Sequence, residues 1–256
     1  MSNVSISTNK LTIGYRATGR SFERQTVVQS DLSFSLYAGE MVCMLGPNGC
    51  GKSTLLRTLA GLQPALSGQY DLCAVGGQDE RSKSIALVLT ERLSMDNTTV
   101  HDVVAMGRYP YTSFLGGLTP EDEEIITEAL CQVGFTLSPF TFQLSPFNSH
   151  SDGEKQRILI AKALAQQTPI VLLDEPTAHL DLPHRILVLR LLRRLAHEQN
   201  KTILISTHEL DLALALSDRI LLMTPGKGIQ LDTAEALKKA DAFTSAFGMD
   251  IFNALG

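Results

Sequence analysis

The stretch with the clearest chemistry is GPNGCGKST, at residues 46–54. It fits the pattern G-x-x-x-x-G-K-[ST], in which glycines let successive backbone N–H groups approach phosphate oxygens. Lys52 would supply positive charge at the outer phosphates, and Ser53 would offer a hydroxyl to Mg²⁺. We therefore predict a nucleotide-phosphate site formed by Gly46, Pro47, Asn48, Gly49, Cys50, Gly51, Lys52, Ser53 and Thr54.

One member of this loop, Cys50, carries a thiol just ahead of a predicted helix. Because a helix N-terminus lowers the pKa of a thiol, one prediction is a reactive cysteine whose modification blocks activity. The alternative is that Cys50 is a small residue that fills space and is shielded by the loop.

Carboxylates and a histidine follow two apolar runs further along the chain. Asp174 and Glu175 come directly after the run at 170–173, and α/β sheets bind ligands at the carboxyl ends of their strands. Asp174 is suited to hold Mg²⁺ through water, and Glu175 to orient an attacking water. His208 follows the run at 202–205, from which a neutral imidazole could reach a γ-phosphate; a polar residue before a helix is the plainer interpretation.

The segment NSHSDGEKQR, at residues 148–157, has the composition of a second helix start that attracts anions. Ser151 is predicted to be the N-cap, and Glu154, three residues later, completes a capping box. Asp152 falls in the first turn, where its charge suits the helix dipole. The ligand contacts would then be the Ser151 hydroxyl and the Gly153 N–H.

An α/β core must position these side chains. Apolar runs at 41–45, 85–89, 170–173, 202–205 and 219–223 suit strands covered on both faces, and residues 32–36 alternate as in a half-buried strand. A helix is expected over 183–198. Residues 91–168 instead contain three helical stretches, of which the second starts at Thr119 and Pro120. We predict a core over 1–90 and 169–256 with a helical lobe inserted at 91–168.

Composition limits the possible partners and locations. The 256 residues carry a net charge of −5 without a block of Lys or Arg, which argues against nucleic acid as the main partner. The four cysteines lack metal-ligand spacing and indicate reduced thiols in a cytosolic protein. The start, MSNVSISTNK, lacks the apolar stretch of a signal peptide, and no run approaches the roughly 20 apolar residues of a membrane span. Any membrane role is expected to come through a partner.

The order of GPNGCGKST, SDGEKQR, LLDEPTAHLD and ISTH resembles the ATP-binding subunits of ABC transporters over nearly the whole chain. The resemblance implies a P-loop NTPase core with a mainly parallel sheet, an N-terminal antiparallel β region and the inserted helical lobe. It also implies hydrolysis of ATP with Mg²⁺ between two copies arranged head to tail. Tyr15 would stack on adenine, Asp181 would belong to the loop that meets the partner copy, and residues 151–154 would face the partner's nucleotide.

A narrower resemblance concerns VVAMGRYPY, at residues 103–111, which is similar to importers of iron-siderophore, cobalamin and haem type. It implies an integral membrane permease and, indirectly, a substrate-binding protein as partners. The subunit would then lie at the cytoplasmic face of the cell membrane as a peripheral protein.

Two departures from the family pattern affect these expectations. The family signature usually reads Leu-Ser-Gly-Gly-Gln, whereas this chain reads His150, Ser151, Asp152, Gly153 and Glu154 in the same places. The family's Gln in the loop from core to lobe is replaced by Thr90 and Glu91. Either Thr90 acts on Mg²⁺ through water, or Glu91 substitutes, or coupling to the transporter is weaker.

Two other classes of function compete with an importer's ATPase. A soluble ABC ATPase acting on ribosomes or DNA usually carries two ATPase halves, or long coils and zinc sites, which this sequence lacks. A regulatory nucleotide-binding module without hydrolysis is disfavoured by Glu175. The sequence therefore predicts the ATP-hydrolysing subunit of an importer.

Overall fold

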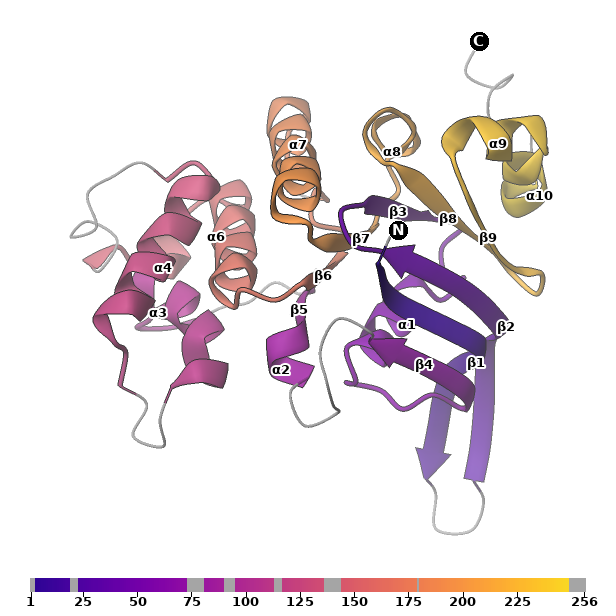
Figure 1. Cartoon of the computed structure of the whole chain (residues 1–256), viewed down its shortest axis with the longest axis horizontal. Coiled ribbons are helices and arrows are strands. Elements are labelled where there is room, and N and C mark those ends of the chain that lie inside the picture. The colour runs from indigo at the N-terminus through magenta and orange to yellow at the C-terminus, as the bar shows by residue number, and fades with distance from the viewer. Residues whose placement is uncertain are drawn as a thin grey trace.

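The structure is a computed structural model that describes residues 3–18, 23–72, 81–89, 95–112, 117–135, 144–178 and 180–248. Its strands form a three-stranded sheet and a six-stranded sheet, and a group of helices lies to one side of both (Figure 1). This is the α/β class that the sequence predicts. Within the described ranges, no helix combines the length and the apolar character that crossing a membrane requires.

The three-stranded sheet is the N-terminal antiparallel region. It has the order β2-β1-β4, from β1 (Val4–Thr18), β2 (Glu23–Tyr37) and β4 (Ser67–Leu72), and both pairings are antiparallel. The alternation predicted at 32–36 is confirmed, because Leu32, Phe34 and Leu36 are all buried. One face of this sheet therefore packs on the rest of the core.

The six-stranded sheet has the order β5-β6-β7-β3-β8-β9. The predicted apolar runs form β3 (Met41–Leu45), β5 (Ile85–Val88), β6 (Ile170–Asp174), β7 (Thr202–Ser206) and β8 (Arg219–Thr224), which pair in parallel. An antiparallel edge strand, β9 (Gly228–Asp232), pairs with β8 and was not predicted. Because the parallel strands all end at one edge, the loops that follow β3, β6 and β7 lie near one another.

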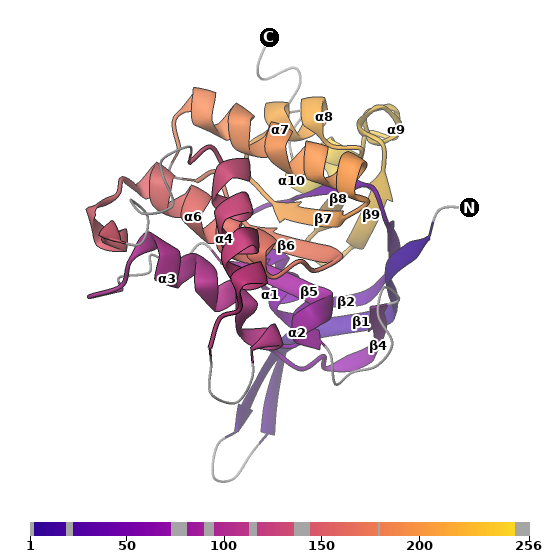
Figure 2. The ribbon, with the colours of Figure 1, turned by 60° about the vertical axis from the view of Figure 1, so that its left-hand side comes forward.

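Hydrophobic residues pack on both faces of this sheet. Met41 and Cys43 of β3 belong to the cluster that includes α7 (Leu182–Gln199) and α8 (Leu210–Leu216). Val42 and Met44 belong to the cluster formed with α1 (Lys52–Leu59) and the three-stranded sheet. Figure 2 shows α7 and α8 above the sheet and the three-stranded sheet below it. This two-sided burial explains why the strands are continuously apolar.

Shorter helices complete the core. The helix α2 (Arg81–Ser84) precedes β5, while α9 (Ala234–Lys239) and α10 (Ala242–Phe247) follow β9. In Figure 1 these last two helices lie at the end of the core farthest from the helical group.

Among the described residues, the helical group consists of α3 (Val100–Ala105), α4 (Pro120–Gln132) and α6 (Asp152–Ala165), with 3₁₀ turns η2 (Met106–Tyr111) and η3 (Phe147–Ser149). The three α-helices start at Thr99, Thr119 and Ser151, and each of these N-caps forms a complete capping box. The predicted helix starts at Thr119 and Ser151 are therefore confirmed. The division of the chain at residues 91 and 168 stays a prediction, since residues 90–94 lie outside the described ones.

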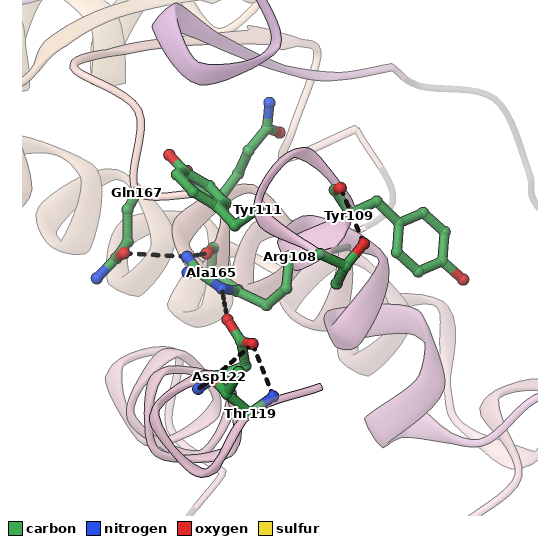
Figure 3. Close-up of polar contacts among 9 residues, drawn as sticks. Arg108, Tyr109, Tyr111, Thr119, Asp122, Ala165 and Gln167 are labelled. Atoms are coloured by element: carbon green, nitrogen blue, oxygen red, sulfur yellow. Dashed lines mark hydrogen bonds and ion pairs between the residues drawn. The ribbon is translucent and has the colours of Figure 1, made fainter. Parts of the chain in front are cut away.

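A buried arginine ties three elements of this group together (Figure 3). Arg108 of η2 is only 5% exposed, and its Nε donates to Asp122 Oδ1 of α4 over 2.7 Å. Its Nη1 donates to the carbonyl of Ala165, at the end of α6, over 2.8 Å and to Gln167 Oε1 over 3.0 Å. The ring of Tyr111 covers the guanidinium, with Cζ 4.2 Å from the ring centroid. We call Arg108, Asp122, Ala165 and Gln167 the Arg108 clamp.

The charge of Asp122 is stabilised from two sides. Its carboxylate accepts hydrogen bonds from the Thr119 N–H and hydroxyl, which form the capping box of α4, and from Arg108. Of these, the Thr119 N–H has the largest effect, and together they lower the pKa of Asp122 to about 2. Asp122 is therefore ionised over the whole physiological range and pairs with a buried cation.

Candidate nucleotide site

Residues 46–51, which the sequence predicts to bind phosphate, connect β3 to α1 in the expected strand-loop-helix context. We call them the phosphate loop. Gly46 has φ 154° and Gly51 has φ 104°, values that side chains rarely adopt. A Cβ on Gly46 would lie 2.5 Å from the Met223 carbonyl oxygen, and one on Gly51 would lie 2.7 Å from Val28 Cγ1. Neither position can accept another residue without moving its neighbours.

Lys52 and its two successors begin α1. The Lys52 side chain is buried, and its Nζ donates to the carbonyls of Gly46, over 2.8 Å, and Pro47, over 3.3 Å. The ammonium group is thus held against the loop whose N–H groups are expected to bind phosphate. Ser53 is exposed, whereas Thr54 is buried and its hydroxyl lies 3.0 Å from the phenol oxygen of Tyr15. Tyr15 itself is half exposed, so its ring is accessible beside α1.

The predicted low pKa of Cys50 is wrong. Its side chain is 2% exposed, and this burial raises the pKa of the thiol, outweighing the charge and N–H of Lys52, which lower it. The sulfur lies 2.8 Å from the place of a Cβ on Gly46, so it packs tightly behind the loop. The alternative, a shielded residue that fills space, is confirmed.

The two carboxylates at the end of β6 lie beside the end of β7. Asp174 is 6% exposed and accepts a hydrogen bond from the Ser206 hydroxyl over 2.5 Å. The Glu175 N–H donates to both the carbonyl and the hydroxyl oxygen of Ser206, each over 3.0 Å. Glu175 has φ 47°, a left-handed conformation that these two hydrogen bonds hold. Ser206 therefore orients both acids.

His208 contacts Glu175 directly. Its Nε2 lies 2.5 Å from Glu175 Oε1, and both side chains are partly exposed. The end of β7 is also bonded to β3, since the Thr207 N–H donates to the Met44 carbonyl over 3.2 Å. The residues that follow β3, β6 and β7 are thus held at one edge of the sheet, which is an arrangement suited to phosphoryl transfer.

The start of α6 has the predicted capping box. The hydroxyl and the N–H of Ser151 donate to Glu154 Oε2 over 2.8 Å and 3.0 Å, and Ser151 Oγ accepts from the Glu154 N–H over 3.3 Å. The Ser151 N–H, followed by its hydroxyl, lowers the pKa of Glu154. Asp152, the first residue of the helix, is exposed.

The structure gives a role to His150. Its ring meets Phe135 edge to face with centroids 6.1 Å apart, while Nε2 lies 2.8 Å from the Ser145 hydroxyl and Nδ1 3.6 Å from Glu154 Oε2. The imidazole therefore packs like an apolar residue and also supports the acid of the capping box.

Asp181 is the N-cap of α7. It accepts hydrogen bonds from the side chain of His184 and, over 3.1 Å, from the His184 N–H, and these bonds lower the pKa of Asp181. The turn before it contacts the start of α6, because a Cβ on Gly153 would lie 3.0 Å from Leu180 Cδ2. The two helix starts that are expected to face a partner copy are thus neighbours.

The structure describes some, but not all, of the residues that are predicted to bind Mg²⁺. Ser53 and Asp174 are described, but Thr90 and Glu91 lie outside the described residues. Among the described residues, no three His, Cys, Asp or Glu side chains form a group that could hold a metal by themselves. The sequence predictions do not include Ser206, although its position directly after an apolar run and two residues before His208 is a usable signal.

Comparisons with known proteins agree with this geometry. A family model described as ABC transporter matches residues 29–178. An ABC transporter ATP-binding protein of Methanocaldococcus jannaschii is 37% identical over 250 residues, covering 95% of this chain and 81% of the relative. The iron(3+)-hydroxamate import ATP-binding protein FhuC of Bacillus subtilis is 35% identical over 250 residues, covering 96% and 88%.

Solved structures give the same result. A metal-chelate type ABC transporter in an inward-facing conformation has a TM-score of 0.80 and 29% identity, covering 96% of this chain and 90% of that chain. A dimeric ABC transporter cassette has a TM-score of 0.73 and 25% identity, covering 90% and 98%.

Proposed function

The chain belongs to the ABC transporter family of ATP-binding proteins, and on that premise we propose that it powers an importer of an iron-siderophore, haem, cobalamin or related metal chelate. Relatives at 34–37% identity support this class, since their names specify import of iron(3+)-hydroxamate, cobalamin and petrobactin and transport of achromobactin. The permease would hold this ATPase subunit peripherally at the cytoplasmic face of the cell membrane, and a substrate-binding protein would deliver the chelate to it.

We propose a part for each residue at the edge of the sheet. Residues 46–54 would bind the phosphates of ATP, and Tyr15 would stack on the adenine. The exposed hydroxyl of Ser53 and the buried carboxylate of Asp174 fit the oxygen ligands that Mg²⁺ prefers, with Asp174 acting through water. Mg²⁺ would neutralise charge on the phosphates. The observation that carries the proposal is that Ser206 joins Asp174 and Glu175 beside the phosphate loop.

Hydrolysis would use residues from two copies. Glu175 would orient and polarise the attacking water, while His208, now paired with Glu175, would turn to the γ-phosphate. Residues 151–154 would face the nucleotide of the partner copy, and Asp181 would contact that copy. Thr90 or Glu91 would couple the nucleotide site to movements of the permease. The dimeric cassette among the similar structures supports this head-to-tail arrangement.

The proposal is tested by ATP hydrolysis together with the identity of the proteins that co-purify. We expect Mg²⁺-dependent hydrolysis and co-purification with a membrane permease. Lys52→Ala is expected to weaken nucleotide binding, because the ammonium group held at Gly46 is lost. Lys10→Ala, on an exposed strand position, is the matched control. Co-purification with ribosomes or DNA instead of membranes would favour the competing class, a soluble ABC ATPase.

The negative charge of Asp152 would repel the phosphates of the partner's nucleotide if its side chain pointed toward them. Two unit charges roughly 8 Å apart repel by about 2 kcal/mol at an effective dielectric of 20, whereas the helix dipole gains only ~0.3–1 kcal/mol from the carboxylate. We therefore propose that Asp152 points away from the phosphate and that Ser151 and Gly153 face it.

We expect Asp152→Gly to lower thermal stability slightly and to leave ATP-driven dimerisation, measured by size exclusion, nearly unchanged. Ser151→Arg is expected to abolish hydrolysis but to spare ATP binding to the monomer. A strong gain in dimerisation for Asp152→Gly would show instead that the carboxylate faces the phosphate and slows closure.

A further inference from the structure

A cleft of about 360 Å³ opens between α4, α6 and α7, apart from every residue assigned to the nucleotide. Its apolar lining comes from Val133 at the end of α4, from Ile160 of α6, and from Leu187, Val188 and Leu191 of α7. Leu187 is 60% exposed, so this lining reaches the surface. The volume lies within the range of small-molecule sites, which are concave and mostly apolar with a few charged groups.

Arg157 of α6 lines this cleft, and one of its donors has no acceptor. Its Nη1 donates to the Val133 carbonyl over 3.3 Å, and its guanidinium lies over the ring of Phe135, with Cζ 4.9 Å from the centroid. Its Nε, however, is buried and makes no hydrogen bond. A buried donor without a partner is costly. The acceptors of the chain itself therefore leave the Arg157 guanidinium incompletely satisfied.

Arg190 and Arg194 line the same cleft from α7. They are four residues apart and therefore project from one side of the helix. Both are exposed, and neither forms an ion pair with any residue in the part of the chain that the structure describes. Three guanidinium groups around one apolar cleft are a local excess of positive charge in a chain whose net charge is −5.

We propose that this cleft binds a small amphiphilic anion, a carboxylate or phosphate ester carried on an apolar body. Guanidinium groups bind such anions through two parallel hydrogen bonds. The anionic group would meet Arg190 and Arg194 at the rim and the guanidinium of Arg157 further in, while the apolar body would cover Val133, Ile160 and Leu191. This inference goes beyond the proposed function, because binding requires neither ATP nor a second copy.

Such a ligand would contact α6 and α7 together. The N-termini of these helices carry Ser151 and Asp181, which are expected to meet the partner copy. A ligand in the cleft would therefore limit movement between the two segments, at a distance from the nucleotide.

The test is binding of decanoate and of decyl phosphate to the full chain, each below its micelle concentration, measured by isothermal titration calorimetry without nucleotide. We expect saturable binding of one molecule per chain. Decyltrimethylammonium, which has the same tail and the opposite charge, is expected not to bind, and inorganic phosphate is expected to bind far more weakly than decyl phosphate.

Variants then locate the site. The double variant Arg190→Gln/Arg194→Gln is expected to weaken binding by about tenfold or more, because charge-assisted hydrogen bonds are lost. Leu187→Glu, at an exposed position, adds a negative charge to the lining and is expected to do the same. Arg193→Gln is the matched control, since it removes one charge from α7 at a residue outside the lining.

Equal binding of decanoate to both cleft variants and to the native chain would overturn the proposal, as would binding of the cationic probe with similar affinity. Binding of an acidic peptide in place of both decyl probes would assign the cleft to a protein partner instead. Because no nucleotide is present, none of these results depends on the ATPase activity.

Discussion

Glu175→Gln is expected to reduce ATP turnover by roughly 10²–10⁴-fold while ATP binding persists, because the amide cannot accept a proton from the attacking water. The substitution keeps the size of the side chain, and the main-chain hydrogen bonds to Ser206 do not depend on the carboxylate. The variant should therefore fold normally and accumulate as an ATP-bound dimer. Turnover is measured by phosphate release and the dimer by size exclusion with ATP.

Asp211→Asn is the matched control, since Asp211 is an exposed acid in the first turn of α8 and lies three residues from His208. It is expected to keep normal turnover. If Glu175→Gln also keeps near-normal turnover, Glu175 is not the residue that activates water, and Asp174 with Ser206 would need another catalytic partner.

Arg108→Met is expected to lower the free energy of unfolding by roughly 3–5 kcal/mol, because it leaves the buried carboxylate of Asp122 without its cation. The carbonyl of Ala165 and the amide of Gln167 lose a donor as well. Urea denaturation measures the loss. The double variant Arg108→Met/Asp122→Leu should recover a substantial part of it, since neither charge then remains buried.

The pair His101 and Glu123 offers a control in the same helical group. It joins α3 to α4 over 2.7 Å, but the Glu123 side chain is 44% exposed. Glu123→Gln is expected to cost about 1 kcal/mol or less, as exposed ion pairs do. Equal losses for Arg108→Met and Glu123→Gln would show that the Arg108 clamp is not the stronger link.

The same clamp predicts a dependence on pH whose sign follows from the pKa of Asp122. That pKa is lowered from 3.8 to about 2, so the stabilisation is complete above about pH 4 and is lost as the pH falls toward 2. The difference in unfolding free energy between the native chain and Asp122→Asn should therefore shrink over this interval. A constant difference from pH 5 to pH 2 would contradict the assignment.

Features that depend on neighbours in the sequence could be predicted. The capping box of Ser151 and Glu154 and the start of α4 at Thr119 follow from side chains three residues apart. The five parallel strands follow from apolar runs whose length and boundaries suit buried strands. The antiparallel β9, with an intermediate and exposed burial pattern, gives no such run and was missed.

Features that depend on contacts between residues far apart in the sequence could not be predicted. The sequence leaves Cys50 open between a reactive thiol at a helix start and a shielded residue that fills space, and only its burial behind Gly46, which raises the pKa of the thiol, decides between them. Ser206 gained its role only when β6 and β7 proved adjacent. Arg108 and Asp122 are fourteen residues apart on different elements, and nothing in the spacing predicts that they pair.

The position of β3 has a consequence for biosynthesis. This strand leads into the phosphate loop, yet it lies between β7 and β8 and hydrogen-bonds to both. While the ribosome synthesises the chain, residues 41–45 emerge long before residues 202–224, and at 5–20 residues per second the wait before β7 begins is roughly 8–30 s. Throughout that interval the apolar segment MVCML has neither of its strand partners. A nascent chain therefore cannot complete the sheet that supports the predicted phosphate loop until synthesis has passed residue 224.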